Sequence, residues 1–73
     1  MLETINADLG ASVWKVLVTA GDEVGPDTTV VVLESMKMEI PVLAEYAGAV
    51  IAVHVAEGAT VQAGDPLVDI EEQ

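Results

Sequence analysis

A single lysine lies between two methionines near the middle of this 73-residue chain, in the stretch Glu34-Ser35-Met36-Lys37-Met38-Glu39. Apolar runs rich in valine lie on both sides of it, which predicts two strands that meet in a hairpin with its tip in solvent. A primary amine held at such a tip can form an amide bond with an activated carboxyl group. We therefore predict that Lys37 is a covalent attachment point.

The chemistry of this amine requires another protein. A lysine amine has a reference pKa near 10.4, so only about one in a thousand or fewer is neutral and nucleophilic at pH 7. We therefore expect a separate ligase to activate the reaction. Lys15 is the only other side-chain amine, and it lies inside a predicted strand beside Trp14. Lys37, on a protruding turn, is the better substrate by shape.

The remaining polar residues form no catalytic or metal-binding pattern. His54 is the only histidine and the chain has no cysteine, so we interpret His54 as an unpaired surface strand residue rather than a base or ligand. Ser35 has no activating base evident in the sequence, which argues against nucleophilic catalysis. Glu71 and Glu72 are interpreted as a solvated chain end. We expect no catalytic residue and no metal site.

Length and charge restrict the possible functions. A chain of 73 residues is expected to form one domain, 1–73, because so short a chain buries only about 60% of its extended surface. Thirteen acidic residues against two lysines give a net charge of -11, which argues against nucleic acid and anionic membranes as partners. No apolar run approaches the roughly 18 to 20 residues of a membrane span, and the N-terminus lacks a basic segment. We expect a soluble, untargeted, cytoplasmic protein.

Glycine and proline divide the chain into short segments rich in valine and isoleucine, without a sustained helical period. This pattern predicts an all-β fold. The expected strands are residues 2–6, 12–18, 29–34, 39–43, 48–55 and 66–71, with two very short strands near Val24 and Val61.

The sequence repeats itself at an offset of 37 residues, which aligns 11–36 with 48–73. The offset pairs Gly21 with Gly58, and glycine at equivalent corners indicates a backbone conformation that a side chain would obstruct. We interpret the repeat as two similar four-stranded halves packed face to face. Only the first half is followed by the Met-Lys-Met stretch.

Alternation predicts which residues of the repeat face the core. The predicted core-facing residues are Trp14, Val16 and Val18 in the first half and Ile51, Val53 and Val55 in the second. Val13 and Val50 fall in the opposite phase. Either a bulge turns these two valines toward the core, or other parts of the chain cover that end of the strand.

Several short motifs follow one another along the chain. They are Val-Trp-Lys-Val at 13–16, Ala-Gly-Asp-Glu-Val at 20–24, Glu-Ser-Met-Lys-Met-Glu-Ile-Pro at 34–41, Gly48, and Gly-Ala-Thr-Val at 58–61. In this combination the chain resembles the biotinyl domain of the biotin and lipoyl carrier superfamily, and it is similar to small free-standing bacterial biotin attachment proteins. The resemblance covers essentially the whole chain. Its weight lies in the placement of Met-Lys-Met after a valine-rich strand inside the repeat.

The resemblance implies a flattened antiparallel barrel or sandwich of two four-stranded sheets, with the lysine hairpin at one end and the chain termini at the other. It implies that Lys37 carries covalent biotin and that Met36 and Met38 are flanking recognition residues. The implied partners are a biotin protein ligase, a biotin carboxylase and a carboxyltransferase. Between the last two, a non-catalytic and monomeric carrier would transfer carboxybiotin.

Two positions depart from the expected pattern. Ala11 and Asp27 stand where the repeat has Gly48 and Gly64, at which the family is expected to have turn glycines. Aspartate tolerates a left-handed conformation, so we expect the turn at 25–27 to form despite the absence of glycine at position 27. Alanine at position 11 indicates a backbone conformation in a commonly allowed region. The unbroken register also leaves no room for the protruding loop of some biotin carriers of fatty-acid synthesis.

Two alternatives remain open on the sequence. A lipoyl carrier would use the same lysine, although lipoyl relatives usually show Asp-Lys-Ala where this chain has Met36-Lys37-Met38. An unmodified β-domain that acts as an interaction or regulatory module would leave Lys37 free.

Overall fold

The computed structural model describes residues 1–73, and all of its regular elements are β-strands. In chain order they are β1 (Leu2–Asn6), β2 (Ala11–Val16), β3 (Glu23–Val24), β4 (Thr29–Ser35), β5 (Met38–Leu43), β6 (Gly48–Val53), β7 (Thr60–Val61) and β8 (Pro66–Glu72). All eight predicted strands are confirmed, although β2 and β6 each end two residues earlier than expected. No helix is present that could cross a membrane.

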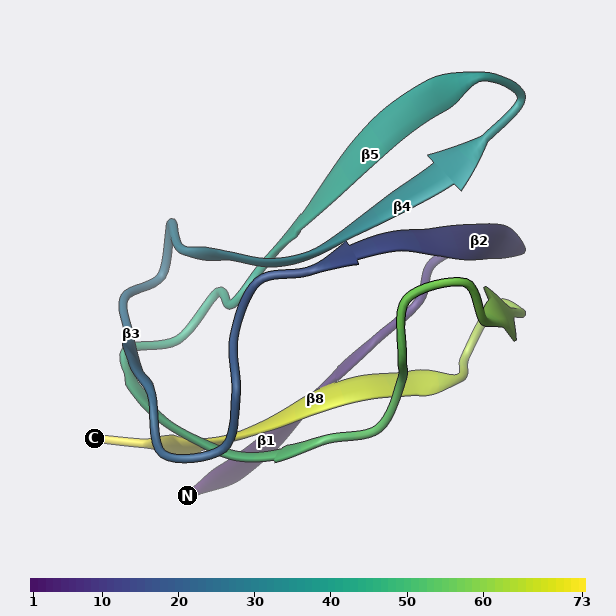
Figure 1. Cartoon of the computed structure of the whole chain (residues 1–73). Helices are drawn as coiled ribbons and strands as arrows, with labels where there is room; N and C mark the ends of the chain where they lie inside the picture. Colours follow the sequence, from purple (N-terminus) through teal and green to yellow (C-terminus); the bar gives the residue numbers. More distant parts are fainter.

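The strands form two four-stranded antiparallel sheets, β1-β8-β6-β3 and β5-β4-β2-β7, which face each other (Figure 1). The predicted sandwich is therefore confirmed. The interpretation of the repeat as two four-stranded halves packed face to face is wrong, because each sheet takes two strands from each half. The chain changes sheet at every connection except the one from β4 to β5, so the halves interlock and neither could bury its apolar face alone.

The repeat extends over the whole chain and leaves one residue unmatched. The pairing of Leu2 with Glu71 corresponds, at the offset of 37, to the pairing of Glu39 with Glu34. The strands β4 and β8, which are equivalent, share the same burial pattern from their second residue onward. Residues 1–36 thus correspond to 38–73, and Lys37 is the residue between them. The ends of the chain lie together, away from the β4–β5 hairpin (Figure 1).

A bulge in each of β2 and β6 changes which residues face the core. Trp14 is an extra residue in the β2–β4 pairing, and Ile51 is the extra residue at the equivalent point between β6 and β8. The prediction that these two face the core is wrong, because the bulges turn them outward to 43% and 51% exposure. Val13 and Val50, immediately before the bulges, are 1% exposed. The other four predicted residues are buried or half-buried: Val16, Val18, Val53 and Val55.

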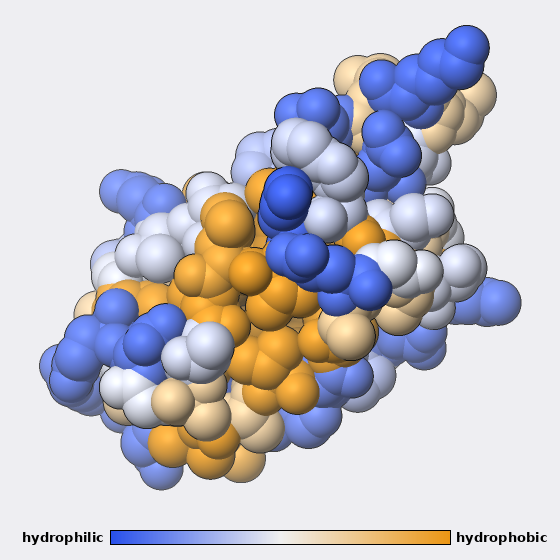
Figure 2. Space-filling model, in the orientation of Figure 1, coloured by the Kyte–Doolittle hydropathy of each residue, from blue (hydrophilic) through white to orange (hydrophobic).

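A core of 14 buried apolar residues fills the space between the sheets. Its largest fully buried members come from both sheets, and they are Leu33, Leu67, Ile70, Val13, Val30, Val31, Val50 and Val68. No charged or polar side chain is buried with them. The space-filling view shows apolar side chains gathered at the centre of one face, between the sheets, with hydrophilic residues around them (Figure 2).

The turn glycines behave partly as the sequence predicts. Gly21 and Gly58 have φ of 100° and 92°, so the expected conformation at these equivalent corners is confirmed. Gly64 has φ of 93°, but Asp27 at the equivalent position has no positive φ, so its tolerance of the left-handed region is not used. The turn before β4 is closed instead by the Thr28 hydroxyl, which accepts a hydrogen bond from the Gly25 amide at 2.9 Å.

Gly48 has a different role from the one expected, because it is the first residue of β6 rather than part of a turn. It is buried where β6 and β8 approach closely, and a Cβ at this position would overlap the main-chain carbonyl oxygen of Glu71. In the first half, the pairing of β2 with β4 begins only at Ser12 and Glu34. Ala11 therefore escapes the close approach, which explains why a side chain is tolerated there.

We expect Gly48→Ala to destabilise the fold by about 1–3 kcal/mol or more, because the added methyl group must push two paired strands apart. Urea unfolding followed by circular dichroism would measure the change in the free energy of unfolding. Gly10→Ala is the matched control, since the nearest atom to its new Cβ is the Val61 carbonyl oxygen at 3.8 Å. Equal stability of the two variants would contradict the close-approach explanation.

Candidate functional site

The connection between β4 and β5 is the only hairpin in the chain, since it alone joins consecutive strands of one sheet. Pairing continues to Ser35 and Met38, so only two residues form the turn. Pairing of β4 with β2 ends at Glu34, so the last part of the hairpin has no neighbouring strand beside β4. Figures 1 and 2 show that the hairpin stands out from the body and that its outermost point is hydrophilic.

The two turn residues adopt an unfavourable backbone conformation. Met36 and Lys37 have φ of 53° and 65°, the pattern of a type I′ turn, which joins two paired strands without splaying them. Such turns favour Asn-Gly, because a side chain in the left-handed region costs roughly 1–2 kcal/mol per residue. Met-Lys is therefore a poor turn sequence for stability, and the strain indicates a function for these side chains.

The Lys37 side chain is exposed and forms neither an ion pair nor a hydrogen bond. Glu34 and Glu39 lie directly opposite each other across the hairpin, and both are exposed. Two like charges in this arrangement reduce stability slightly. The amine is thus presented at the end of a strained turn, with no base placed to remove its proton.

The methionines beside Lys37 do not fold back on the body of the molecule. Met36 is 91% exposed and Met38 is 65% exposed. Exposed thioether side chains are apolar and flexible, and they suit contact with partners of varied shape. The tip therefore offers two apolar groups and one amine to whatever approaches it.

Lys15, the competing amine, lies in β2, where it pairs with Val32 of β4. Its Nζ is 5.5 Å from the centroid of the Trp14 ring, within the range of a cation–π interaction. The side chain lies against the sheet rather than on a protruding turn. The structure therefore agrees with the preference for Lys37 on shape.

His54 has a partner, so its interpretation as an unpaired residue is wrong. Its Nε2 lies 2.9 Å from Oδ2 of Asp69 on the neighbouring strand, and the Thr4 hydroxyl donates to Oδ1 of the same carboxylate at 2.8 Å. These hydrogen bonds, with the charge of His54, lower the pKa of Asp69. The cluster lies on the outer side of the other sheet, away from the hairpin, and we interpret it as a structural contact between strands.

The other polar groups do not form a reaction centre. Ser35 is half-buried at the end of β4 and makes no side-chain hydrogen bond. No group of three or more histidine, aspartate or glutamate side chains is arranged to hold a metal ion. The chemical possibilities of the site are therefore those of an accessible amine, namely acylation by an external enzyme.

Comparison with known proteins agrees with this geometry. The biotin/lipoyl family model, described as "Biotin-requiring enzyme", matches residues 4–70. The chain belongs to this family. The match extends from within β1 to within β8, so it takes in the hairpin and both sheets.

Relatives of this biotin/lipoyl chain include small carriers and large enzymes. It is 52% identical over 65 residues to the "Biotinylated protein TB7.3 homolog" of Mycobacterium leprae, covering 89% of this chain and 92% of that protein. It is 45% identical over 67 residues to the "Biotin carboxyl carrier protein" of Streptococcus mutans, covering 92% of this chain and 52% of that protein. This chain therefore spans about half the length of the second relative.

A solved structure with the same fold is part of a much larger protein. The structure of a single-chain, multi-domain long-chain acyl-CoA carboxylase matches with a TM-score of 0.92 and 30% identity. The match covers 99% of this chain and 7% of the carboxylase chain. The biotin/lipoyl fold thus occurs both in proteins of this size and as a small part of a multi-domain chain.

We expect Met36→Asn to raise the free energy of unfolding by up to about 1 kcal/mol, because asparagine accepts a positive φ at lower cost. Chemical denaturation would measure it. Met38→Asn is the matched control, since Met38 is a strand residue without positive φ. If Met36→Asn is no more stable than Met38→Asn, the turn is not strained as described.

We expect Asp69→Asn to reduce stability by less than about 1 kcal/mol near pH 6, as is usual for an exposed ion pair. The folded pKa of Asp69 lies below its ordinary value of about 3.9, so the ionised carboxylate stabilises the fold above roughly pH 4, and this contribution is lost as the pH falls further. Unfolding curves at several pH values should show the two proteins converging at low pH. Asp27→Asn, which removes an exposed aspartate, is the control, and its stability should match that of the parent protein at every pH. A stability difference between Asp69→Asn and the parent that stays the same at low pH would contradict this account.

Proposed function

We propose that this chain is a biotin carrier protein in which the ε-amine of Lys37 is joined to biotin by an amide bond. The observation that carries the proposal is the position of Lys37 in the strained two-residue turn of the only hairpin, in a chain of the biotin/lipoyl family. The residues present fit the group: an exposed amine without competing contacts is flanked by two exposed apolar side chains. Relatives whose names include "biotinylated" and "biotin carboxyl carrier" support the choice of biotin.

Attachment depends on a biotin protein ligase that supplies an activated carboxyl group and accepts the proton of the amine. The tip has no hydrogen-bonded base of its own, so catalysis resides in the ligase. Met36 and Met38 supply apolar contact area on both sides of the amine, which is the recognition role that we assign to them. Acylation removes one positive charge and makes an already acidic chain more negative by one unit.

The chain itself binds, presents and moves the group rather than catalysing a reaction. When bound, biotin accepts a carboxyl group at a biotin carboxylase and yields it at a carboxyltransferase. The projecting hairpin brings the attachment point clear of the sheets, so that a flexible arm can enter the active site of each partner. Tethering raises the local concentration at both sites without tight docking, which suits a monomer of one biotinyl domain, 1–73.

Lipoate is the alternative cargo, and an unmodified β-domain is the alternative without cargo. The family model covers both kinds of attachment, but the methionines on both sides of Lys37 differ from the Asp-Lys-Ala of most lipoyl relatives. The two alternatives predict different masses for the protein isolated from its native host. Mass is therefore the most direct test of the proposal.

We expect intact-mass spectrometry of the protein, incubated with a biotin protein ligase, ATP and biotin, to show an increment of one biotinyl group. Peptide mapping should place it on Lys37, and Lys37→Arg should abolish it. Lys15→Arg is the matched control and should be modified at the parent rate, because its side chain lies against the Trp14 ring. A lipoyl increment on the native protein, an unshifted mass with excess ligase, or modification of Lys37→Arg would each overturn the proposal.

A further inference from the structure

A groove of about 260 Å³ opens between β5 and the segment that follows β1, on the side of the molecule where these edge strands lie. Its apolar part is lined by Leu9, Leu33 and Ile40, and Val42 lies further along β5. Pockets for drug-sized ligands typically exceed about 300 Å³, so a space of this size suits a smaller group. The lining residues belong to none of the functions described above.

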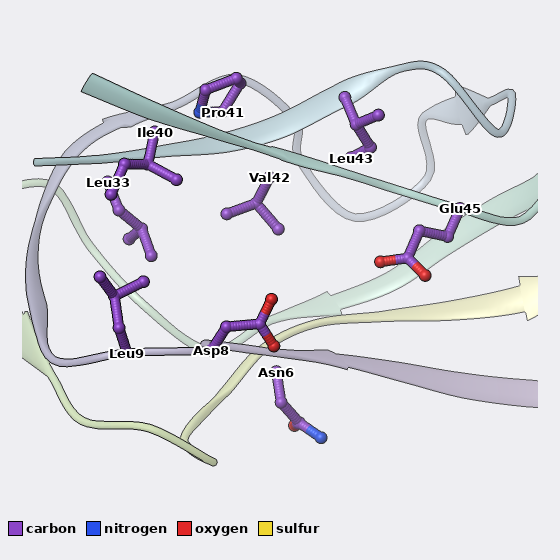
Figure 3. A pocket seen from close by; sticks show the side chains of 9 residues that line it. All are labelled: Asn6, Asp8, Leu9, Leu33, Ile40, Pro41, Val42, Leu43 and Glu45. Carbon is purple, nitrogen blue, oxygen red and sulfur yellow. The ribbon is translucent and has the colours of Figure 1, made fainter. Parts of the chain in front are cut away.

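The side chains in this groove converge from opposite sides. Figure 3 shows Ile40, Leu33 and Val42 pointing toward the segment of Leu9 and Asp8, while Pro41 points away from it. The Leu9 side chain points back toward them from the opposite wall. The floor is apolar because Leu33 belongs to the fully buried core.

Two carboxylates supply the polar part of the groove. Asp8 lies below Val42, and the Glu45 carboxylate is directed toward it from the far end (Figure 3). The two residues are equivalent at the repeat offset of 37, so they form a matched pair. Glu45 is also the only residue besides Met36 and Lys37 that is not glycine and has a positive φ, of 68°. Strain of this kind tends to collect at functional positions, and here it directs an acidic side chain toward an apolar groove.

The corresponding place in the other half of the repeat is closed. The equivalents of Leu9 and Ile40 are Tyr46 and Glu3, and the charge of Glu3 is the main cause of the raised pKa of Tyr46. Tyr46 is half-buried against the core, so a large ring fills the space that is hollow beside Leu9. No second groove exists in the chain. The two halves of the repeat therefore differ at this groove as well as at the lysine turn.

A row of apolar side chains connects these two places. Met38, Ile40 and Val42 occupy alternate positions of β5, so they project from the same face of the strand and lead from the turn into the groove. Glu39 and Pro41 project from the opposite face. Three residues of antiparallel strand span about 10 Å, which is the distance along β5 from Lys37 to Ile40. A lysine side chain extended by the pentanoyl chain of biotin has about ten bonds of roughly 1.5 Å and spans roughly 12 Å.

We infer that this groove is a docking site for the biotinyl group on Lys37 of the same chain. The apolar edge of the bicyclic ring packs against Leu9, Leu33 and Ile40, and a ureido N–H donor faces the carboxylate of Asp8 below Val42. The Glu45 carboxylate, directed toward Asp8 from the far end, adds negative charge there. An apolar body with N–H donors at its outer end matches an apolar groove with an acceptor, Asp8, beside its apolar part. This inference rests on the proposed attachment of biotin to Lys37.

The test compares the unmodified and biotinylated chains by NMR, after mass spectrometry has confirmed one biotinyl group on Lys37. We expect chemical-shift differences at Asp8, Leu9, Ile40 and Val42, and nuclear Overhauser effects between ring protons and the methyl groups of Leu9 and Ile40. Differences confined to residues 35–39 would overturn the inference and leave the proposed function intact. A missing biotinyl mass would instead reject the proposed function.

Charge-matched variants separate docking from a general effect of acidity. Asp8→Asn with Glu45→Gln should abolish the ring-to-methyl effects, whereas Glu34→Gln with Glu39→Gln, which removes the same charge from the hairpin, should leave them in place. The spectra are recorded over a tenfold dilution, and unchanged effects support docking within one molecule. Effects that disappear on dilution would assign the groove to the arm of a second copy and overturn the inference as stated.

Discussion

The register of β4 against β5 constrains the entire lysine end of the molecule. Because pairing continues to Ser35 and Met38, two residues must reverse the chain, and the twist of the strands requires positive φ at both. A longer and more relaxed loop would remove the strain but would also let the amine move relative to the sheets. The two-residue turn restricts the Lys37 backbone more than a longer loop would. The lysine side chain is therefore the flexible part of this end, and the paired hairpin backbone is the more rigid part.

The same pairing rules operate twice in the chain, which makes the differences between the halves informative. Strands, bulges and corner glycines recur at the offset of 37, since each half must present the same backbone to its partner. A side chain is tolerated at Ala11 but not at Gly48, because the pairing of β2 with β4 stops one residue pair short of the equivalent pairing of β6 with β8. The departures at Leu9 and Ile40 have no such explanation in the pairing. They open a space on the lysine side that the pairing alone does not require.

Much of the fold can be predicted from sequence patterns, because those patterns reflect the backbone conformation that each segment adopts. Valine-rich segments between glycines located all eight strands, and Gly21 and Gly58 marked corners that do require positive φ. Alternation failed at Trp14 and Ile51, because counting by twos assumes that no extra residue is inserted. The opposite phase of Val13 and Val50 was the available signal for the bulges.

The site was predictable in position but not in conformation. The Met-Lys-Met stretch located the end of the hairpin. The type of turn could not be predicted, because methionine and lysine at positions 36 and 37 are not the residues that usually form such turns. The partner of His54 was also hidden, since Asp69 is 15 positions away along the chain and only the sheet brings the two together. The groove depends on side chains from three separate segments, and no local pattern reports such a space.

A carrier has to release its group as well as hold it, and the two carboxylates of the groove bear on this requirement. In the proposed docking, a ring without an added carboxyl group offers an N–H donor to Asp8, and the Glu45 carboxylate is directed toward the same place. Addition of a carboxyl group to a ring nitrogen removes one donor and brings a negative charge, which nearby carboxylates oppose. Docking would therefore favour the unloaded arm and free the loaded one. Under the proposed docking, the residues with positive φ lie on either side of the path of the arm: Met36 and Lys37 at the turn, and Glu45 beyond the groove.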